Sequence, residues 1–205
     1  MNSSAKSRII AGSLEMLSPH ANDWIFVDIG FSKDNRSCGI AIGDSKPRVI
    51  HYGDLFREIK IAIELEKDKS FVNVLIEAPL SAAFNVRGNP TGRSFEKRNA
   101  AHRYWYENAG AATLLATMYL LQKIHRKAFP TEIRLFEGFA SFKQTTESSS
   151  HEDDVSILRS VALGHSEEGK IMEGEELKMQ SDDAIRSAFE VAGMHFGVPA
   201  VIVVE

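Results

Sequence analysis

The order of the secondary-structure patterns constrains the fold of this chain more than any other feature. Three short apolar strand patterns come first, at residues 24–30, 37–43 and 47–51, and the links between them are short. Short links predict that these three strands form an antiparallel meander. Strands and helices alternate after the meander, which predicts an α/β fold with helices packed on a layered sheet.

The later elements follow this alternation. Residues 54–67 place apolar side chains at helical spacing, and Asp54 is the predicted N-cap. The nearly continuous apolar run at 71–79 predicts a buried strand that ends at Glu77, because Pro79 prevents its continuation. The remaining predicted elements are a long helix over 94–127, a strand over 132–138, helices over 152–163 and 181–195, and a closing strand over 199–205.

Length and composition place the chain among soluble globular proteins. Its 205 residues are 43% hydrophobic and 25% charged, which suffices for one domain with a sizeable core. Because no repeat or linker divides the chain, we predict an N-terminal extension over residues 1–22 and one domain over 23–205. The single cysteine, Cys38, fits a reducing compartment. No apolar run has membrane-spanning length and no signal peptide is recognised, so we expect a cytoplasmic protein without a membrane partner.

Acidic residues stand at the ends of several predicted elements. Asp28 interrupts the first apolar strand, where a carboxylate is costly unless a cation, a basic group or backbone donors compensate its charge. Sites in α/β sheets gather at the carboxyl ends of parallel strands. The other acids in such positions are Glu77 and Glu137, at two later strand ends, and Asp182 and Asp183, at a predicted helix start.

The order of elements, together with the motifs FVDIG, LIEAP and DDAIRSAF, resembles the ribonuclease H-like superfamily. Within it, the chain is most similar to the RuvC-type and DUF429-type nucleases, over about residues 24–196. The resemblance implies a ribonuclease H-like three-layer fold, in which helices flank a mixed central sheet of an antiparallel meander and parallel strands. It also implies that Asp28, Glu77, Asp183 and Glu137 are catalytic, and that Asp28, Glu77 and Asp183 or Asp182 hold metal.

The resemblance implies a metal-dependent nuclease. Hydrolysis of a phosphodiester needs an activated water and stabilised oxygen charges, which two Mg²⁺ or Mn²⁺ ions about 4 Å apart supply. These hard cations take oxygen ligands, so a few carboxylates suffice to hold them. Asp28 would bridge the two ions, Glu77 and Asp183 would each hold one, and Glu137 would bind metal or orient water.

One departure from the family pattern leaves other functions open. The late helix of these families often carries a second acid three residues after the first, and counted from Asp183 that position is Arg186. A non-catalytic binding or adaptor protein of the same fold is therefore an alternative. An actin-like nucleotide-binding ATPase is a more distant one, because this chain holds one copy of the fold and no glycine-rich phosphate loop.

A basic stretch supplies candidate contacts to nucleic acid. Residues 87–103 hold five basic side chains and one acid, in a segment that begins with glycines and a proline typical of a loop. Phosphate contacts need such side chains near the metals. The candidates are Arg87, Arg93, Lys97, Arg98 and Arg103, with DNA or RNA as the partner. RuvC-type relatives are commonly dimers, so a homodimer is a further candidate state. The histidines, His151 among them, show no zinc-ligand spacing with Cys38.

Overall fold

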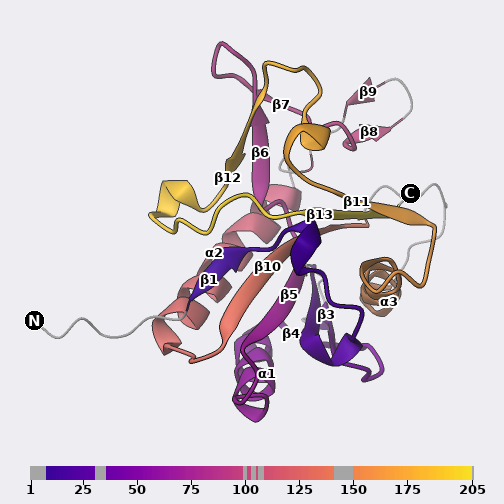
Figure 1. The fold of residues 1–205 in the computed structure, drawn as a ribbon, viewed down its shortest axis with the longest axis vertical. Helices are drawn as coiled ribbons and strands as arrows, with labels where there is room; N and C mark the ends of the chain where they lie inside the picture. Colours follow the sequence, from indigo (N-terminus) through magenta and orange to yellow (C-terminus); the bar gives the residue numbers. More distant parts are fainter. Residues whose placement is uncertain are drawn as a thin grey trace, which may run out of the picture.

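The computed structural model describes residues 8–30, 36–98, 101–102, 105, 109–140 and 150–204. These residues form an eight-stranded mixed sheet, two smaller sheets and three α-helices (Figure 1). The main sheet has the order β11-β13-β10-β5-β2-β3-β4, with β1 paired to β10. Its strands are β1 (Ile9–Ala11), β2 (Trp24–Ile29), β3 (Arg36–Ile42), β4 (Arg48–His51), β5 (Phe71–Glu77), β10 (Glu132–Phe139), β11 (Gly169–Met172) and β13 (Val201–Val204).

The predicted combination of antiparallel and parallel strands is confirmed. Strands β2, β3 and β4 form the antiparallel meander, and β5, β10 and β13 continue the sheet in parallel from β2. Strand β11 closes one edge, antiparallel to β13. The N-terminal segment before residue 23 contributes β1, which runs parallel to the first half of β10, from Ile9 opposite Ile133.

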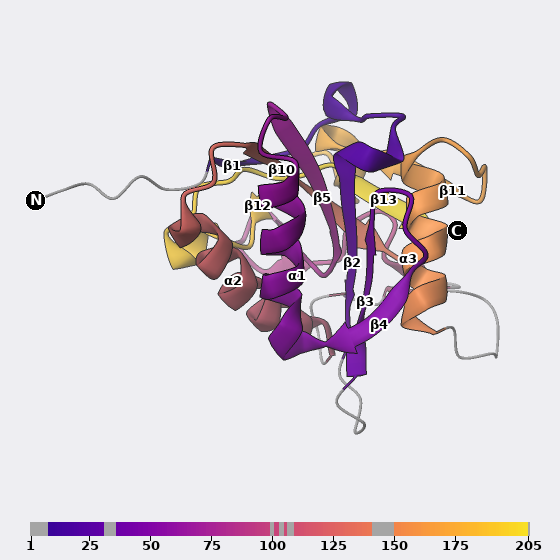
Figure 2. The same cartoon turned by 90° about the horizontal axis from the view of Figure 1, so that it is seen from below.

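Helices pack on both faces of the main sheet. Helices α1 (Tyr52–Leu65) and α2 (Ala109–Lys127) lie on one side of the strands, and α3 (His151–Ala162) lies on the other (Figure 2). Successive side chains of β2 alternate accordingly: Ile25 packs with α1 and α2, and Trp24 packs with α3. This explains why the strand is apolar at nearly every position, and it is compatible with the predicted three-layer arrangement.

The predicted helix over 94–127 is wrong in its first part, because α2 begins only at Ala109. Residues Lys97–Arg98 and Ala101–His102 instead pair as the short strands β8 and β9. Phe95 and Trp105 pack against Phe139 at the end of β10, at ring centroid distances of 4.9 and 5.4 Å. These tertiary contacts of Phe95 and Trp105 are not visible in the local helical spacing of the sequence.

The predicted helix over 181–195 is also wrong. Ala184–Ser187 forms strand β12, which pairs antiparallel with β6 (Ser81–Phe84), and β6 pairs in turn with β7 (Pro90–Thr91). Only a short 3-10 turn, Glu190–Ala192, follows. The small sheet stands beyond the end of β5 (Figure 1), and β6 supplies a strand partner from a distant part of the chain. A smaller error concerns α1, whose N-cap is His51 and whose first turn contains Asp54.

Candidate metal centre

Two of the predicted site residues lie side by side at the ends of neighbouring strands. Asp28 of β2 stands directly opposite Glu77 of β5 in the parallel register. Both carboxylates are buried. Alternation along the strands turns both side chains toward the face that α3 covers, because Phe26 and Leu75, two residues earlier on each strand, also pack there.

The N-terminus of α3 brings two further polar side chains to this point. Ser150 caps the helix: its Oγ accepts a hydrogen bond from the Asp153 backbone N–H at 3.2 Å, and the Asp153 carboxylate accepts one from the Ser150 N–H at 3.1 Å. This reciprocal capping fixes where the helix begins. His151 and Asp154, three residues apart, therefore lie on one face of the first turn, the face toward the strands.

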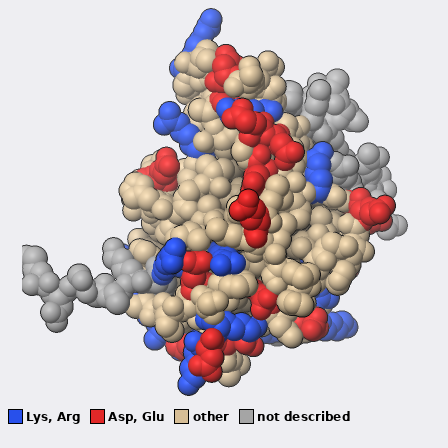
Figure 3. All heavy atoms as spheres, viewed as in Figure 1, with Lys and Arg blue, Asp and Glu red and all other residues tan. Residues whose placement is uncertain are grey.

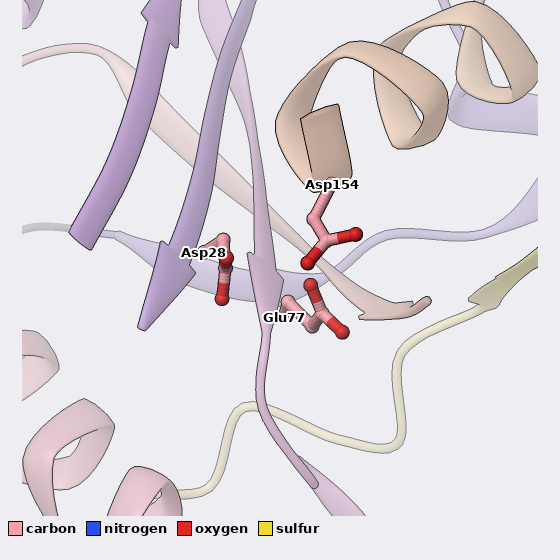
Figure 4. A group of neighbouring side chains, drawn as sticks. All are labelled: Asp28, Glu77 and Asp154. Carbon is pink, nitrogen blue, oxygen red and sulfur yellow. The ribbon is translucent and has the colours of Figure 1, made fainter. Parts of the chain in front are cut away.

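Asp154 completes a cluster of three carboxylates. One oxygen from each of Asp28, Glu77 and Asp154 lies within 4.8 Å of the others, and Figure 4 shows Asp154 reaching from the helix toward the two strand residues. Like charges at this separation repel strongly where water is scarce. The donor set consists of hard oxygens, the type that Mg²⁺, Mn²⁺ and Ca²⁺ prefer. The cluster therefore fits a divalent cation.

His151 binds the first of these carboxylates. Its Nδ1 lies 2.5 Å from Oδ2 of Asp28, and this hydrogen bond raises the pKa of His151, while partial burial opposes the rise. Two glycines make room for it, because a Cβ on Gly30 would collide with the His151 ring and one on Gly39 with the His151 carbonyl oxygen. When protonated, the imidazole offsets part of the negative charge of the cluster.

The Glu77 carboxylate is also held from a neighbouring strand. Its Oε1 accepts a hydrogen bond of 3.1 Å from the backbone N–H of Ala140, the residue that follows β10. The end of β10 thus fixes one oxygen of the cluster without itself contributing a ligand.

The structure does not bring Glu137 into this cluster. In the register of β10 with β5, Glu137 pairs with Ile76, and it is Gly138 that pairs with Glu77. Glu137 therefore points to the opposite face of the sheet from Glu77. There its Oε1 forms an ion pair of 2.7 Å with Arg93, and burial raises the pKa of Glu137 to about 7 although Arg93 opposes the rise.

Asp182 and Asp183 lie on the turn before β12, apart from the cluster that the described residues form. Asp183 is buried and accepts a hydrogen bond of 3.0 Å from the Gln180 backbone N–H, whereas Asp182 is exposed. The helix residue of the cluster that the sequence interpretation missed is Asp154. Its signal is the pattern His151-x-x-Asp154, which places two polar side chains one turn apart at the start of a helix that the sequence did predict.

The predicted nucleic-acid contacts divide into three groups. Arg93 is fully buried in ion pairs and cannot contact a phosphate, whereas Arg87 is exposed on the turn between β6 and β7. The side chains of Lys97 and Arg98, and all of Arg103, lie outside the described residues. On the face drawn in Figure 3, acidic side chains form a band near the centre, so this view displays no continuous basic surface.

Comparison with models of protein families, with curated proteins and with solved structures finds no match to this chain. The interpretation of the centre therefore rests on its own geometry. Among the described residues, no helix is both long and apolar enough to cross a membrane.

Proposed function

We propose that this chain is a metal-dependent nuclease of the ribonuclease H-like type that hydrolyses phosphodiester bonds of DNA or RNA. The observation that carries the proposal is the convergence of Asp28, Glu77 and Asp154 from two strands and a capped helix. Random surface acids rarely place three oxygens so close in a buried setting, because their repulsion opposes folding.

The topology supports the same proposal. The order β4-β3-β2-β5-β10, with an antiparallel meander extended by parallel strands, agrees with the arrangement that the family resemblance implies. The cluster lies where the parallel strands β2 and β5 end, the expected place for a site in such a sheet. On α3, His151 and Asp154 reproduce the spacing of the paired helix ligands, with a histidine in place of one acid.

The residues present suit the chemistry. Asp28, Glu77 and Asp154 would hold Mg²⁺ or Mn²⁺, and the bound ions would activate water and stabilise charge on the phosphate oxygens. The chain itself orients the ligands: Ala140 fixes one oxygen of Glu77, and His151 fixes one of Asp28. His151 also keeps a proton at Nδ1, next to the carboxylate.

Calorimetric titration with Mn²⁺ and Mg²⁺ tests the proposal directly. We expect the wild type to bind, Asp28→Asn and Asp154→Asn to bind more weakly by at least about tenfold, and Glu152→Gln to bind like the wild type. Glu152 is the matched control, because it is an exposed acid in the same first turn of α3. Cleavage of labelled DNA and RNA should follow the same order, and absence of ion binding by the wild type would refute the proposal.

A further inference from the structure

We infer that Arg93 and Glu137 are positioning residues of the candidate metal centre: their buried network locks the ends of β5 and β10 together and so holds Glu77 in place. The inference concerns the metal-free chain first, and its consequence for metal binding rests on the proposed function. Neither residue is a member of the carboxylate cluster, so neither is assigned a catalytic role.

Arg93 is the centre of the network. Its guanidinium lies between two buried carboxylates, at 2.7 Å from Oε1 of Glu137 and 2.6 Å from Oε1 of Glu96. It also donates to Oγ of Ser81 at 2.7 Å. Arg93, Glu96 and Glu137 are all fully buried, so each depends on the others to offset the cost of leaving water.

Glu137 transmits this anchoring to the chain that follows Glu77. Its Oε2 accepts hydrogen bonds of 3.1 Å from the backbone N–H groups of Leu80 and Ser81 and from Ser81 Oγ. In the reverse direction, Glu77 at the end of β5 accepts from the N–H of Ala140, just beyond β10. The two glutamates thus cross-link the same two strand ends, one on each face of the sheet.

A second path connects Arg93 to Ala140 through aromatic side chains. The guanidinium lies over the ring of Phe95, with its carbon 4.6 Å from the centroid. Phe95 packs edge-on against Phe139, the last residue of β10, at 4.9 Å, and Trp105 contacts the same ring at 5.4 Å. Phe139 directly precedes Ala140, whose N–H binds Glu77. The first path therefore reaches the chain just after Glu77, the acceptor of this hydrogen bond, and the second reaches Ala140, its donor.

The network holds Arg93 in one position, because several partners bind its guanidinium at the same time. A planar guanidinium bridges two carboxylates and a hydroxyl at once, which a lysine ammonium on a flexible chain does not reproduce. Arg93→Lys keeps the positive charge and leaves part of the network unsatisfied. Glu137→Gln keeps an oxygen that accepts from Leu80 and Ser81, but its amide NH₂ then faces the Arg93 guanidinium in place of Oε1, so this change should loosen the network as well.

Amide hydrogen exchange of the metal-free protein, followed by NMR at Leu80, Ser81 and Ala140, tests the inference. In Arg93→Lys we expect exchange at all three amides to be faster than in wild type by about tenfold, beyond any change in global stability. In Glu137→Gln we also expect faster exchange at these amides, because an amide NH₂ replaces the oxygen that pairs with the buried Arg93 guanidinium. Ile133→Val, a buried truncation at the other end of β10, supplies the control for general destabilisation.

Two outcomes of the exchange measurement would overturn the inference. In the first, Leu80 and Ser81 exchange faster while Ala140 does not, which would confine the network to its own loop. In the second, amides throughout the protein exchange faster by the same factor, as general destabilisation in Ile133→Val would produce. If Arg93→Lys does not fold, Ser81→Ala provides the same readings, since it removes one hydroxyl that both Arg93 and Glu137 bind.

The consequence for metal is measured separately. Arg93→Lys should bind Mn²⁺ more weakly than wild type by about tenfold, the usual effect of removing support from behind a ligand. If the wild type binds Mn²⁺ and Arg93→Lys binds it with the same affinity, the inference is also overturned. A wild type that binds no Mn²⁺ would refute the proposed function instead, and exchange at Ala140 would still decide whether the network holds Glu77.

Discussion

Removal of one carboxylate from the cluster should make the metal-free protein more stable. The substitution is Asp154→Asn, which keeps the shape of the side chain and removes its charge. The three oxygens lie within 4.8 Å of one another, so Asp154 forms two repulsive pairs. At an effective dielectric constant of about 20 each pair would repel by about 3 kcal/mol, and because Asp154 is only half-buried, water screens both well below that value.

Two terms reduce this gain. When His151 is protonated, which its hydrogen bond to Asp28 favours by raising its pKa, its positive charge offsets part of the repulsion. Asp154 also lies in the first turn of α3, where an acid stabilises the helix by about 0.5 kcal/mol. We therefore expect the free energy of unfolding of Asp154→Asn to exceed that of the wild type by about 1 to 2 kcal/mol in EDTA.

Urea denaturation with and without Mn²⁺ measures both halves of this argument. Glu152→Gln removes an acid from the same helical turn outside the cluster, so its difference from Asp154→Asn isolates the repulsion. Mn²⁺ should stabilise the wild type and Glu152→Gln, because an ion that binds only the folded state shifts the equilibrium, and it should leave Asp154→Asn nearly unchanged. If Asp154→Asn is less stable than Glu152→Gln in EDTA, the three carboxylates are not held in repulsion and the reasoning fails.

Three further predictions concern pH, packing and thiol reactivity. Burial raises the pKa of Glu137 from 4.5 to about 7, so its contribution to stability is present below the unfolded pKa and is lost as the pH rises through about 7. From pH 5 to pH 8 the wild type should therefore lose up to about 3 kcal/mol more stability than Glu137→Gln, measured by urea denaturation at both pH values; equal losses would contradict the raised pKa. Gly39→Ala should destabilise the fold by about 2 kcal/mol and weaken Mn²⁺ binding, because its methyl group would push His151 away. Gly53→Ala is the control and should cost nothing, because Gly53 has open space around it. Circular dichroism melts measure the stability and calorimetry the binding, and tolerance of Gly39→Ala would show that α3 can move. Burial raises the pKa of Cys38 to about 11, so iodoacetamide should label the native chain far more slowly than the urea-unfolded chain, and rapid native labelling would contradict its burial.

The sequence predicted the parts of the site that strands alone determine. Buried strands are apolar on both faces, and an acid in such a strand is visible as an interruption, as at Asp28 and Glu77. Their adjacency followed from the rule that parallel strands end at one edge. Glu137 also lies near the end of a parallel strand, yet it points to the other face, because one residue of register reverses the direction of a side chain. Register between distant strands is not encoded in the local pattern, so the sequence could not separate these acids.

The same limit explains the interpretation of Arg93. A basic residue in a glycine-containing loop resembles a phosphate contact, and only the folded chain reveals two buried glutamates around it. Glu96 stands three residues away in sequence, but Glu137 arrives from a strand more than forty residues later. Whether a charged side chain is buried or exposed depends on such distant partners, and these cannot be identified from the local sequence.

Asp154 shows that local signals can suffice if the right ones are combined. The sequence contains a capping pair, Ser150 and Asp153, at the start of a predicted helix, and the next residues repeat a ligand spacing of one turn. The motif alone did not distinguish this helix from the segment around Asp183, which folds as a turn and a strand instead. The deciding feature is where the helix N-terminus docks, and the side-chain-free surface at Gly30 and Gly39 admits His151 there. A helix start that carries ligands at this spacing, together with glycines on the strands it must approach, is therefore a stronger predictor of the centre than acids at strand ends alone.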